Sequence, residues 1–417
     1  MRLNGPLWRI SGDLTFRVNL HLGDFIVGTG PMTKALIDRS EYPSFPEKVY
    51  MNQASIGMLS STTVAAMTSF IDSTGRFGSL LMSDDEEIEY LGNLRIVGGR
   101  LFNCNLTNVA ILAGASELLG QLPSLMSPKS GEEILMVDTD FPALTRPWLQ
   151  FAKTSGSCVQ FVKDLPARDL TDTLCERIGP STSVVAVSHV QYGTGTIIDV
   201  PRLTSRAGDV GALVIIDATQ SAGAINVDTK LWGADIVVAS GYKWLGGHGG
   251  VALGYVSDTM LRETPVLPGW MSTEHPFDFD ATSVEYAVDA RRFLQSTMSY
   301  VSVASLSASL NQLLSFSPDV RENHSKTLSR ELFNGLNGSG WVAHHPGGSS
   351  AASTHIISLS NPKFSAREIY EQLLARGVIC STRNNRLRIS VAAFNDSSDI
   401  SRVIAALCNG QRVGAGG

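Results

Sequence analysis

Short apolar runs recur through the middle of the chain, and each run ends in small or polar residues. Four of them, near residues 110, 135, 185 and 215, are followed by segments with the apolar spacing of helices. Strands that are apolar on both faces are typical of parallel sheets, in which a crossover helix links each strand to the next. The pattern therefore predicts an α/β fold with a mostly parallel sheet and helices on both faces.

The remaining apolar pattern outlines the ends of the chain. Helical spacing predicts further helices at 60–73, 84–102, 300–314 and 366–376. We divide the chain into an N-terminal extension with a small-domain segment (1–45), a large domain (46–290) and a smaller C-terminal α/β domain (291–417). Mixed apolar and polar residues between 14 and 26 predict a short hairpin or strand in the extension.

One lysine stands between two apolar runs. Lys243 follows the run 236–239 and precedes a glycine-dense turn that leads into the run 251–256. Burial in such a setting disfavours the ammonium form, and a neutral amine is what a Schiff base with an aldehyde cofactor requires. Lys243 is therefore our candidate for binding pyridoxal 5'-phosphate (PLP). The alternative is a lysine at a strand end whose amine extends into water.

A carboxylate ends the preceding apolar run. Asp217 comes 26 residues before Lys243 (243 − 217), which is room for one crossover helix and one strand. The C-terminal ends of parallel strands lie at one edge of the sheet, where α/β proteins bind ligands. A carboxylate there can keep the pyridine nitrogen of PLP protonated, which makes the ring an electron sink. A helix N-cap is the alternative role for Asp217.

The segments 215–224 (IIDATQSAGA) and 240–250 (SGYKWLGGHGG) resemble the class V aminotransferase family of fold-type I PLP enzymes. That family includes cysteine desulfurases, kynureninases, isopenicillin N epimerase and C–S lyases, and the resemblance runs from about residue 42 to about residue 407. It implies a large domain with a sheet of the seven-stranded type. It also implies that Gln220 lies near the phenolic oxygen of the cofactor, and that Ser240 and Tyr242 reach its phosphate.

Two further segments supply candidate cofactor contacts. A strand that turns into a helix at Ala115 and Ser116 forms an anion site, because free backbone amides and the positive end of the helix dipole meet there. We assign both residues to the cofactor phosphate, and helix capping by Ser116 is compatible with that role. By resemblance to kynureninase-like members, Phe141 stacks on the pyridine ring; a phenylalanine of the core is the alternative.

His189 follows the strand near residue 185, in a segment that lies beside cofactor and substrate in the resembling family. We predict that it bonds the phenolic oxygen of the cofactor or relays a proton, and a purely structural histidine is the alternative. Tyr192, three residues further on, is another candidate for contact with the substrate.

Arg388 is the predicted substrate anchor. It lies in an LRIS segment (387–390) that resembles the family's carboxylate-binding motif. A planar guanidinium binds a carboxylate through two parallel hydrogen bonds, so Arg388 would hold the α-carboxylate of an amino acid. By the same resemblance, the backbone around Ala54 and Ser55 faces the substrate, and an ordinary turn is the alternative.

The resemblance also implies a homodimer. The segment 268–271 (PGWM) resembles kynureninase-like members, in which the residue at Trp270 lies near the phosphate. The segment 289–297 (DARRFLQST) resembles one whose threonine, here Thr297, reaches the phosphate of the neighbouring subunit. Ser296 stands where the family usually has glycine, which leaves the geometry of that turn open.

Composition narrows the class of protein. The chain has 417 residues, and its formal charge of −6 with no basic cluster predicts no nucleic-acid partner. No apolar run is long enough to span a membrane, and no signal peptide is recognisable. Five scattered cysteines predict neither a disulfide framework nor a zinc site, and no metal is expected. They fit a reducing cytoplasm.

These features predict a PLP enzyme that acts on an α-amino acid through an external aldimine, as an aminotransferase or a β-eliminating (C–S) lyase. An epimerase and a kynureninase-type hydrolase are the alternatives among enzymes. Desulfuration through a persulfide is disfavoured, because Cys380 lies only 8 residues before Arg388 (388 − 380), inside an expected strand. A catalytically silent protein of the same fold that binds a partner is the alternative of a different class. Such a scaffold would have no physical need for five residues that occur together here: Ser116, Asp217, Gln220, Lys243 and Arg388.

Overall fold

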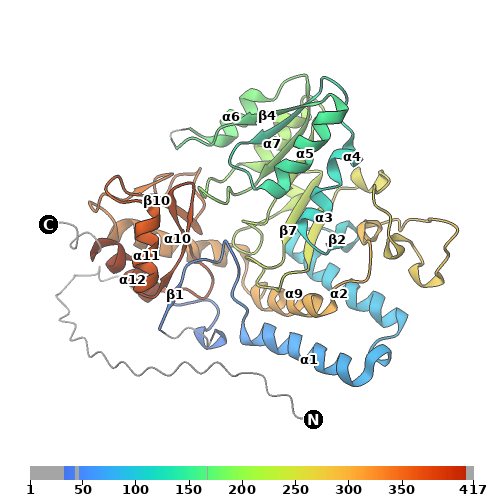
Figure 1. Ribbon diagram of the computed structural model, residues 1–417, viewed down its shortest axis with the longest axis horizontal. Coiled ribbons are helices and arrows are strands. Elements are labelled where there is room, and N and C mark those ends of the chain that lie inside the picture. Colours follow the sequence, from blue (N-terminus) through green and yellow to red (C-terminus); the bar gives the residue numbers. More distant parts are fainter. Residues whose placement is uncertain (1–31, 43–46, 167, 410–417) are drawn as a thin grey trace, which may run out of the picture. The chain divides into compact units, whose positions relative to one another are not determined.

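The computed structural model describes residues 32–42, 47–166 and 168–409 (Figure 1). From Thr33 onward these residues belong to one compact unit. The hairpin or strand predicted in the N-terminal extension lies outside the described residues. Within the described part of the chain, no helix is both long enough and apolar enough to cross a membrane.

A seven-stranded sheet forms the centre of the large domain, in the order β2-β8-β7-β6-β5-β3-β4. The five strands from β7 to β4 in that order run parallel, whereas β8 is antiparallel to both of its neighbours. The prediction of an α/β fold with a mostly parallel sheet is therefore confirmed. The strands are β2 (Val109–Leu112), β3 (Glu133–Val137), β4 (Cys158–Val162), β5 (Thr182–Ser188), β6 (Leu213–Asp217), β7 (Ile236–Ser240) and β8 (Ala252–Val256).

Helices cover both faces of this sheet. Because successive side chains of a strand point to opposite faces, β6 places Ile215 in one hydrophobic core and Val214 and Ile216 in the other. The first core is completed by helices α3 (Ala115–Leu119), α4 (Leu122–Met126) and α5 (Pro142–Ser155). The second is completed by α2 (Asp84–Phe102), α6 (Leu170–Arg177), α7 (Val200–Gly208), α8 (Thr229–Trp232) and α9 (Tyr300–Leu313).

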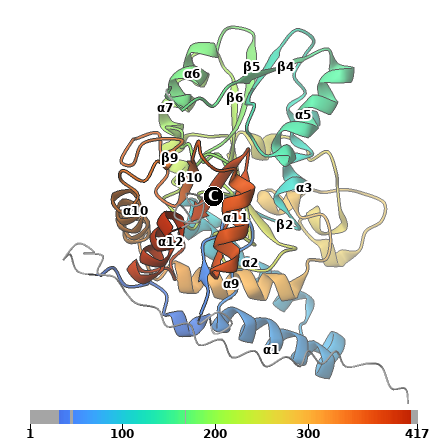
Figure 2. The ribbon, with the colours of Figure 1, turned by 60° about the vertical axis from the view of Figure 1, so that its left-hand side comes forward.

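Helix α1 (Ser61–Phe77) packs along α9, as both ribbon views show (Figures 1 and 2). A capping box between Ser83 and Glu86 and four acidic residues in the first turn begin α2, which suits the positive end of the helix dipole. Short 3₁₀ helices connect these elements, at Arg39–Glu41, Gly78–Leu80, Leu106–Asn108, Met260–Arg262, Trp270–Ser272, Pro276–Asp278 and Ala290–Phe293.

The smaller domain is built on a four-stranded antiparallel sheet in the order β12-β13-β10-β9. Its core joins this sheet to helices α10, α11 and α12. A two-residue turn at Asn384 and Asn385, both with positive φ, connects β12 to β13 as expected for a tight hairpin. The elements are β9 (Val342–Ala343), β10 (Ile356–Ser360), β12 (Ser381–Arg383), β13 (Arg386–Ser390), α10 (Pro318–Gly335), α11 (Ala366–Ala375) and α12 (Ser397–Asn409).

Two elements pack on the other side of the domain boundaries that we place at residues 45 and 290. These boundaries remain predictions. Strand β1 (Val49–Tyr50) pairs in parallel with β11 (Val378–Ile379), and Val49 belongs to the core of the smaller domain. Conversely, α9 lies beyond residue 290 and packs in the core of the large domain. The segment that follows β1 therefore connects the small core to the large sheet, and this segment contributes to the site described next.

Candidate active site

A cavity of about 200 Å³ lies where several strands of the large sheet end. Ser188, Asp217 and Ser240 end the adjacent parallel strands β5, β6 and β7, so their side chains meet at one edge of the sheet. Nine of the residues predicted from the sequence line this cavity: Ala115, Ser116, Phe141, Tyr192, Asp217, Gln220, Ser240, Tyr242 and Lys243.

Lys243 is 7% exposed and points its amine into the aromatic part of the cavity. Its Nζ lies 5.3 Å from the centre of the Phe141 ring and 5.7 Å from that of Tyr242. Burial lowers the pKa of Lys243 to about 8; Asp217 opposes this effect, and the positive charges of Arg388 and Arg383 add to it. A substantial fraction of the amine is therefore neutral near physiological pH.

The backbone of Lys243 is held by the segment that follows β1. Gln53 Nε2 donates a hydrogen bond of 2.9 Å to the Lys243 carbonyl. A Cβ atom at Gly57 would lie 2.3 Å from that same oxygen, so only glycine allows the segment to approach so closely. The turn at 53–57 thus supports the lysine from outside the large sheet.

Asp217 lines the same cavity from the end of β6. Burial raises the pKa of Asp217, while hydrogen bonds with Thr219 and the charge of Lys243 oppose the increase. Thr219 N donates to Asp217 Oδ1 at 2.9 Å. Among the described residues, Asp217 and Lys243 form no direct ion pair, so the carboxylate and the amine face one cavity without closing it. This arrangement fits a ring that carries a basic nitrogen at one end and an aldehyde on another side.

Phe141 and Tyr192 form an aromatic wall, with ring centres 5.4 Å apart and planes at 84°. The position of Phe141 is fixed by its neighbour Asp140, whose Oδ1 accepts hydrogen bonds from Ser188 N at 3.0 Å and Gln191 Nε2 at 2.8 Å. Burial raises the pKa of Asp140 to about 7 in spite of these hydrogen bonds. Asp140 therefore links the end of β3 to the end of β5 directly beside the cavity.

Arg388 is 1% exposed on β13 and reaches towards the same region. Nη1 donates to the Tyr192 carbonyl at 2.8 Å, Nε donates to Ser381 Oγ at 3.1 Å, and Nη2 donates to Ser55 Oγ. No carboxylate pairs with Arg388 among the described residues. Burial, with a contribution from Arg383, lowers the pKa of Arg388 to about 9. A buried cation without an anionic partner is costly, and this cost favours a site for an anionic ligand.

Ala54 and Ser55 lie in the turn at 53–57, and polar contacts hold them there. Ser55 Oγ accepts hydrogen bonds from Arg388 and from Arg383 Nη2, the latter at 3.2 Å. The Ala54 carbonyl accepts from Gln220 Nε2 at 3.0 Å, and Gln220 Oε1 accepts from Trp244 Nε1 at 2.8 Å. The Gln220 amide thus has protein partners on both of its polar atoms.

The structure does not bring His189, Trp270 or Thr297 to this cavity. The His189 ring packs edge-on against Trp232, with ring centres 4.6 Å apart, and burial lowers the pKa of His189 to about 3. Ser188 takes the cavity-facing position at the end of β5, and the next side chain points into the core. Trp270 and Thr297 are exposed.

Thr219 is a site residue that the sequence reasoning passed over. Besides its bond to Asp217, its Oγ1 accepts from Ser240 N at 3.1 Å, which ties the ends of β6 and β7 together. The signal for the first contact was present in the sequence, because an aspartate side chain commonly accepts a hydrogen bond from the backbone amide two residues later.

A family model and several curated relatives point to the same protein family. The model of the family described as Aminotransferase class-V matches residues 100–403. An uncharacterized aminotransferase, YcbU, of Bacillus subtilis is 25% identical over 368 residues, which are 88% of this chain and 95% of the relative. A kynureninase of Deinococcus radiodurans is 34% identical over 185 residues, 44% of this chain and 43% of the relative.

Two solved structures share the fold. One is a mutant of C-DES with glycine covalently linked to its PLP cofactor, with a TM-score of 0.81 and 21% identity over 89% of this chain and 99% of the other. The other is the cysteine desulfurase CsdA of Escherichia coli, with a TM-score of 0.78 and 19% identity over 90% of this chain and 98% of the other.

Proposed function

Because the chain belongs to the class V aminotransferase family of PLP-dependent enzymes, we propose that it acts on an α-amino acid by transamination or by β-elimination of the C–S lyase type. The observation that carries the proposal is that Lys243 and Asp217 face one cavity. Arg388, which has no carboxylate partner in the part of the chain that the structure describes, donates to the carbonyl of Tyr192, another residue that lines this cavity.

The residues of the cavity divide into groups that suit the parts of PLP. Lys243 would hold the aldehyde carbon and Asp217 the ring nitrogen, while Phe141 would lie against the ring face. Ala115 and Ser116 at the start of α3, with Ser240 and Tyr242, would surround the phosphate. When bound there, PLP withdraws electrons from the substrate Cα, which makes its proton removable.

Substrate handling follows from one cationic and one basic side chain beside the ring site, Arg388 and Lys243. Arg388 would bind the α-carboxylate through two parallel hydrogen bonds. Lys243 is neutral in part near pH 8 and is the base that removes the Cα proton. Where Lys243 would deliver that proton distinguishes the two reactions: delivery to the cofactor side would give transamination, and departure of a β-substituent would give elimination.

We propose that the enzyme does not form a persulfide on Cys380. This residue is 2% exposed, and burial raises the pKa of its thiol to about 12, so that the nucleophilic thiolate is scarcely populated.

The five cysteines are free thiols, which supports a reducing compartment such as the cytoplasm as the enzyme's location.

A kynureninase-type hydrolase is the second candidate, supported by Phe141-Pro142 and by the similarity to kynureninases over part of the chain. Epimerisation is the remaining alternative and has no supporting observation of its own. One experiment separates these outcomes: the PLP-loaded enzyme is incubated with single amino acids, and the products are identified. A keto acid formed only with an amino acceptor indicates transamination, ammonia with pyruvate indicates elimination, and anthranilate from kynurenine indicates hydrolysis.

If no amino acid in such a panel were changed while PLP bound normally, the enzymatic proposal would fail in favour of a binding protein of the same fold. Inversion at Cα without other products would identify the epimerase. Each outcome is read from the products alone and is independent of the assignment of single residues.

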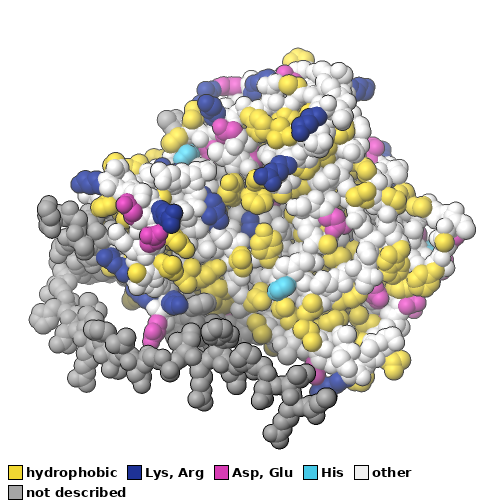
Figure 3. Space-filling view, in the orientation of Figure 1, with side chains coloured by type: hydrophobic (Ala, Val, Ile, Leu, Met, Phe, Trp, Pro, Cys, Tyr) yellow, Lys and Arg dark blue, Asp and Glu magenta, His cyan; other side chains and the backbone are white. Residues whose placement is uncertain are grey.

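We further propose a homodimer, with Thr297 and Trp270 serving the cavity of the partner subunit. Hydrophobic side chains gather over the segment between β8 and α9, towards the right of the view in Figure 3. Exposed large apolar residues of that segment and of α1 are Val64, Ile71, Phe77, Val266, Leu267, Trp270, Phe279, Val284 and Val288. Exposed apolar surface of this kind supports burial against a second copy.

A further inference from the structure

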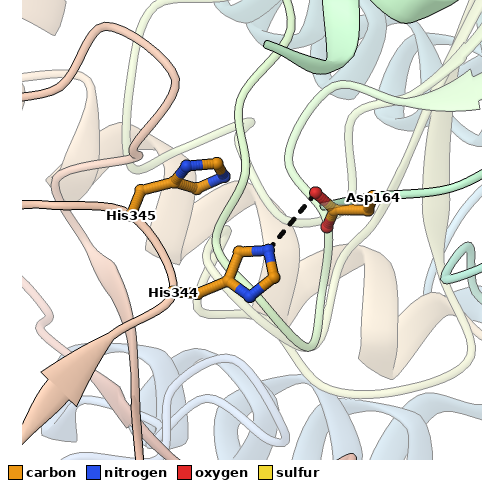
Figure 4. A group of neighbouring side chains, drawn as sticks. All are labelled: Asp164, His344 and His345. Carbon is orange, nitrogen blue, oxygen red and sulfur yellow. Dashed lines mark hydrogen bonds and ion pairs between the residues drawn. The ribbon is translucent and has the colours of Figure 1, made fainter. Parts of the chain in front are cut away.

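A cluster of three buried side chains lies outside the active site, between the large and the small domain. Asp164 follows β4 of the large sheet, whereas His344 and His345 follow β9 of the small sheet (Figure 4). Each of the three is less than one tenth exposed. We propose that Asp164, His344 and His345 bind a divalent transition-metal ion, with Zn²⁺ as the preferred ion. Two imidazoles and one carboxylate are a recognised donor set for such ions.

The distances between the three side chains fit coordination of one metal ion. His344 Nε2 and Asp164 Oδ1 are 3.4 Å apart, which is long for a hydrogen bond between nitrogen and oxygen. It matches the separation of about 3.3 Å between two ligands that each lie about 2.0 Å from a tetrahedral Zn²⁺. One ligand atom from each residue lies within 4.8 Å of the other two. A movement of His345 by at most about 1.5 Å would therefore bring its ring to the same ion.

The surroundings resemble those of a ligating carboxylate. Thr194 Oγ1 donates to Asp164 Oδ2 at 2.6 Å, and Thr196 Oγ1 lies 2.9 and 3.0 Å from the two carboxylate oxygens. Thr196 Oγ1 also lies 2.7 Å from His345 Nε2, so one hydroxyl contacts two of the proposed ligands. Such hydrogen bonds orient ligands and hold them in place around an ion.

A metal here would fasten the two domains together. Thr196 forms a β-bridge with Ala352, and Ser353 N donates to the Gly195 carbonyl, so the cluster adjoins a place where the two domains already touch. An ion shared by Asp164 and the two histidines would add direct bonds across this junction. Its expected effect is structural, because none of the three residues lines the active-site cavity.

The test uses the full-length, PLP-loaded enzyme after removal of metals with a chelator. Titration with Co²⁺ should give one equivalent of binding and the visible absorption of a four-coordinate ion without sulfur ligands, and Zn²⁺ should displace it and raise the melting temperature. Thr196→Val should weaken Zn²⁺ binding by about 10- to 100-fold. His344→Gln and His345→Gln should weaken it further, while His275→Gln, at an exposed histidine outside the cluster, should bind as the wild type does.

Three results would overturn the proposal: no stoichiometric Co²⁺ binding by the wild type, a spectrum with sulfur-to-cobalt bands, or equal binding by the two histidine variants and by His275→Gln. Circular dichroism establishes that each variant is folded. If a variant does not fold, the Co²⁺ spectrum of the wild type still decides, because sulfur ligation or absence of binding excludes the cluster without any mutation.

Discussion

Replacement of Arg388 by methionine should make the enzyme more stable and a poorer binder of its substrate. The side chain is fully buried, makes three hydrogen bonds and has no carboxylate partner among the described residues. A residue that serves only the fold should lose stability when it is removed. If the residue instead serves to bind an anionic substrate, its replacement should stabilise the substrate-free protein, because a charge without a partner is then no longer buried.

The size of the effect follows from the buried charge. Burial lowers the pKa of Arg388 to about 9, a displacement of about 3.5 pH units that corresponds to roughly 5 kcal/mol at about 1.36 kcal/mol per pH unit. Methionine avoids this cost but leaves the Tyr192 carbonyl without its donor, which costs about 1–3 kcal/mol, and removes the hydrogen bond to Ser381, worth about 1 kcal/mol. Ser55 Oγ keeps its hydrogen bond from Arg383. The net stabilisation of the substrate-free enzyme is therefore about 1–3 kcal/mol. Because the folded pKa lies below the unfolded one, the penalty is fully present below about pH 9 and declines as the pH rises further.

The loss of a charge-assisted pair with the substrate carboxylate should cost roughly 2–3 kcal/mol, which raises KM by about 30- to 150-fold. The assay measures the melting temperature of the substrate-free enzyme and the steady-state kinetics with the substrate identified from the product panel. Arg386→Met is the matched control. Arg386 bonds to Ser358 and Ser360 within the small sheet and lies outside the lining of the active-site cavity, so its loss should leave KM unchanged.

The reasoning is refuted if Arg388→Met is less stable than the wild type and keeps its KM. That outcome would make Arg388 a structural residue of the small domain, equivalent to Arg386. A rise in KM for both variants would also refute it, because the effect would then reflect a general disturbance of β13.

The other predictions concern Lys243, Cys380 and the dimer. Lys243→Ala should lose the absorption band of the lysine-bound cofactor, and an unchanged spectrum would remove Lys243 from the site. The rate of PLP uptake by the apoenzyme should rise with pH through about 8, because burial lowers the pKa of Lys243 and only the neutral amine reacts. In Arg388→Met the midpoint should move to higher pH, because the charge of Arg388 also lowers the pKa of Lys243. A pH-independent rate would contradict the assignment. Cys380→Ala should retain activity. If this variant were inactive and no longer released sulfur from the substrate, the desulfurase mechanism would have to be reconsidered. Sedimentation should show a dimer, and Thr297→Ala should weaken PLP retention; a monomer that binds PLP normally would disprove the role in trans.

Much of the site follows from local sequence. The apolar run that ends at Asp217 and the one that precedes Lys243 had to be buried strands, and the 26 residues between them admit one crossover. Parallel strands of one sheet bring their C-terminal ends to the same edge, so the meeting of carboxylate and amine in one cavity was predictable from spacing alone. The same pattern predicted a mostly parallel sheet, whereas its seven strands were expected only from the family resemblance.

Other features depended on which face a side chain takes and on which distant segments meet. His189 is adjacent in sequence to a cavity residue, yet the alternation of side chains at the end of β5 directs it into the core. The contact of Arg388 with Ser55 joins residues 333 positions apart, and Asp164 meets His344 across 180 positions. Sequence spacing fixes the period of an element and the residues at its end. Only the packing of the two domains fixes which charges remain unpaired, and those charges determine where an anion or a metal ion can bind.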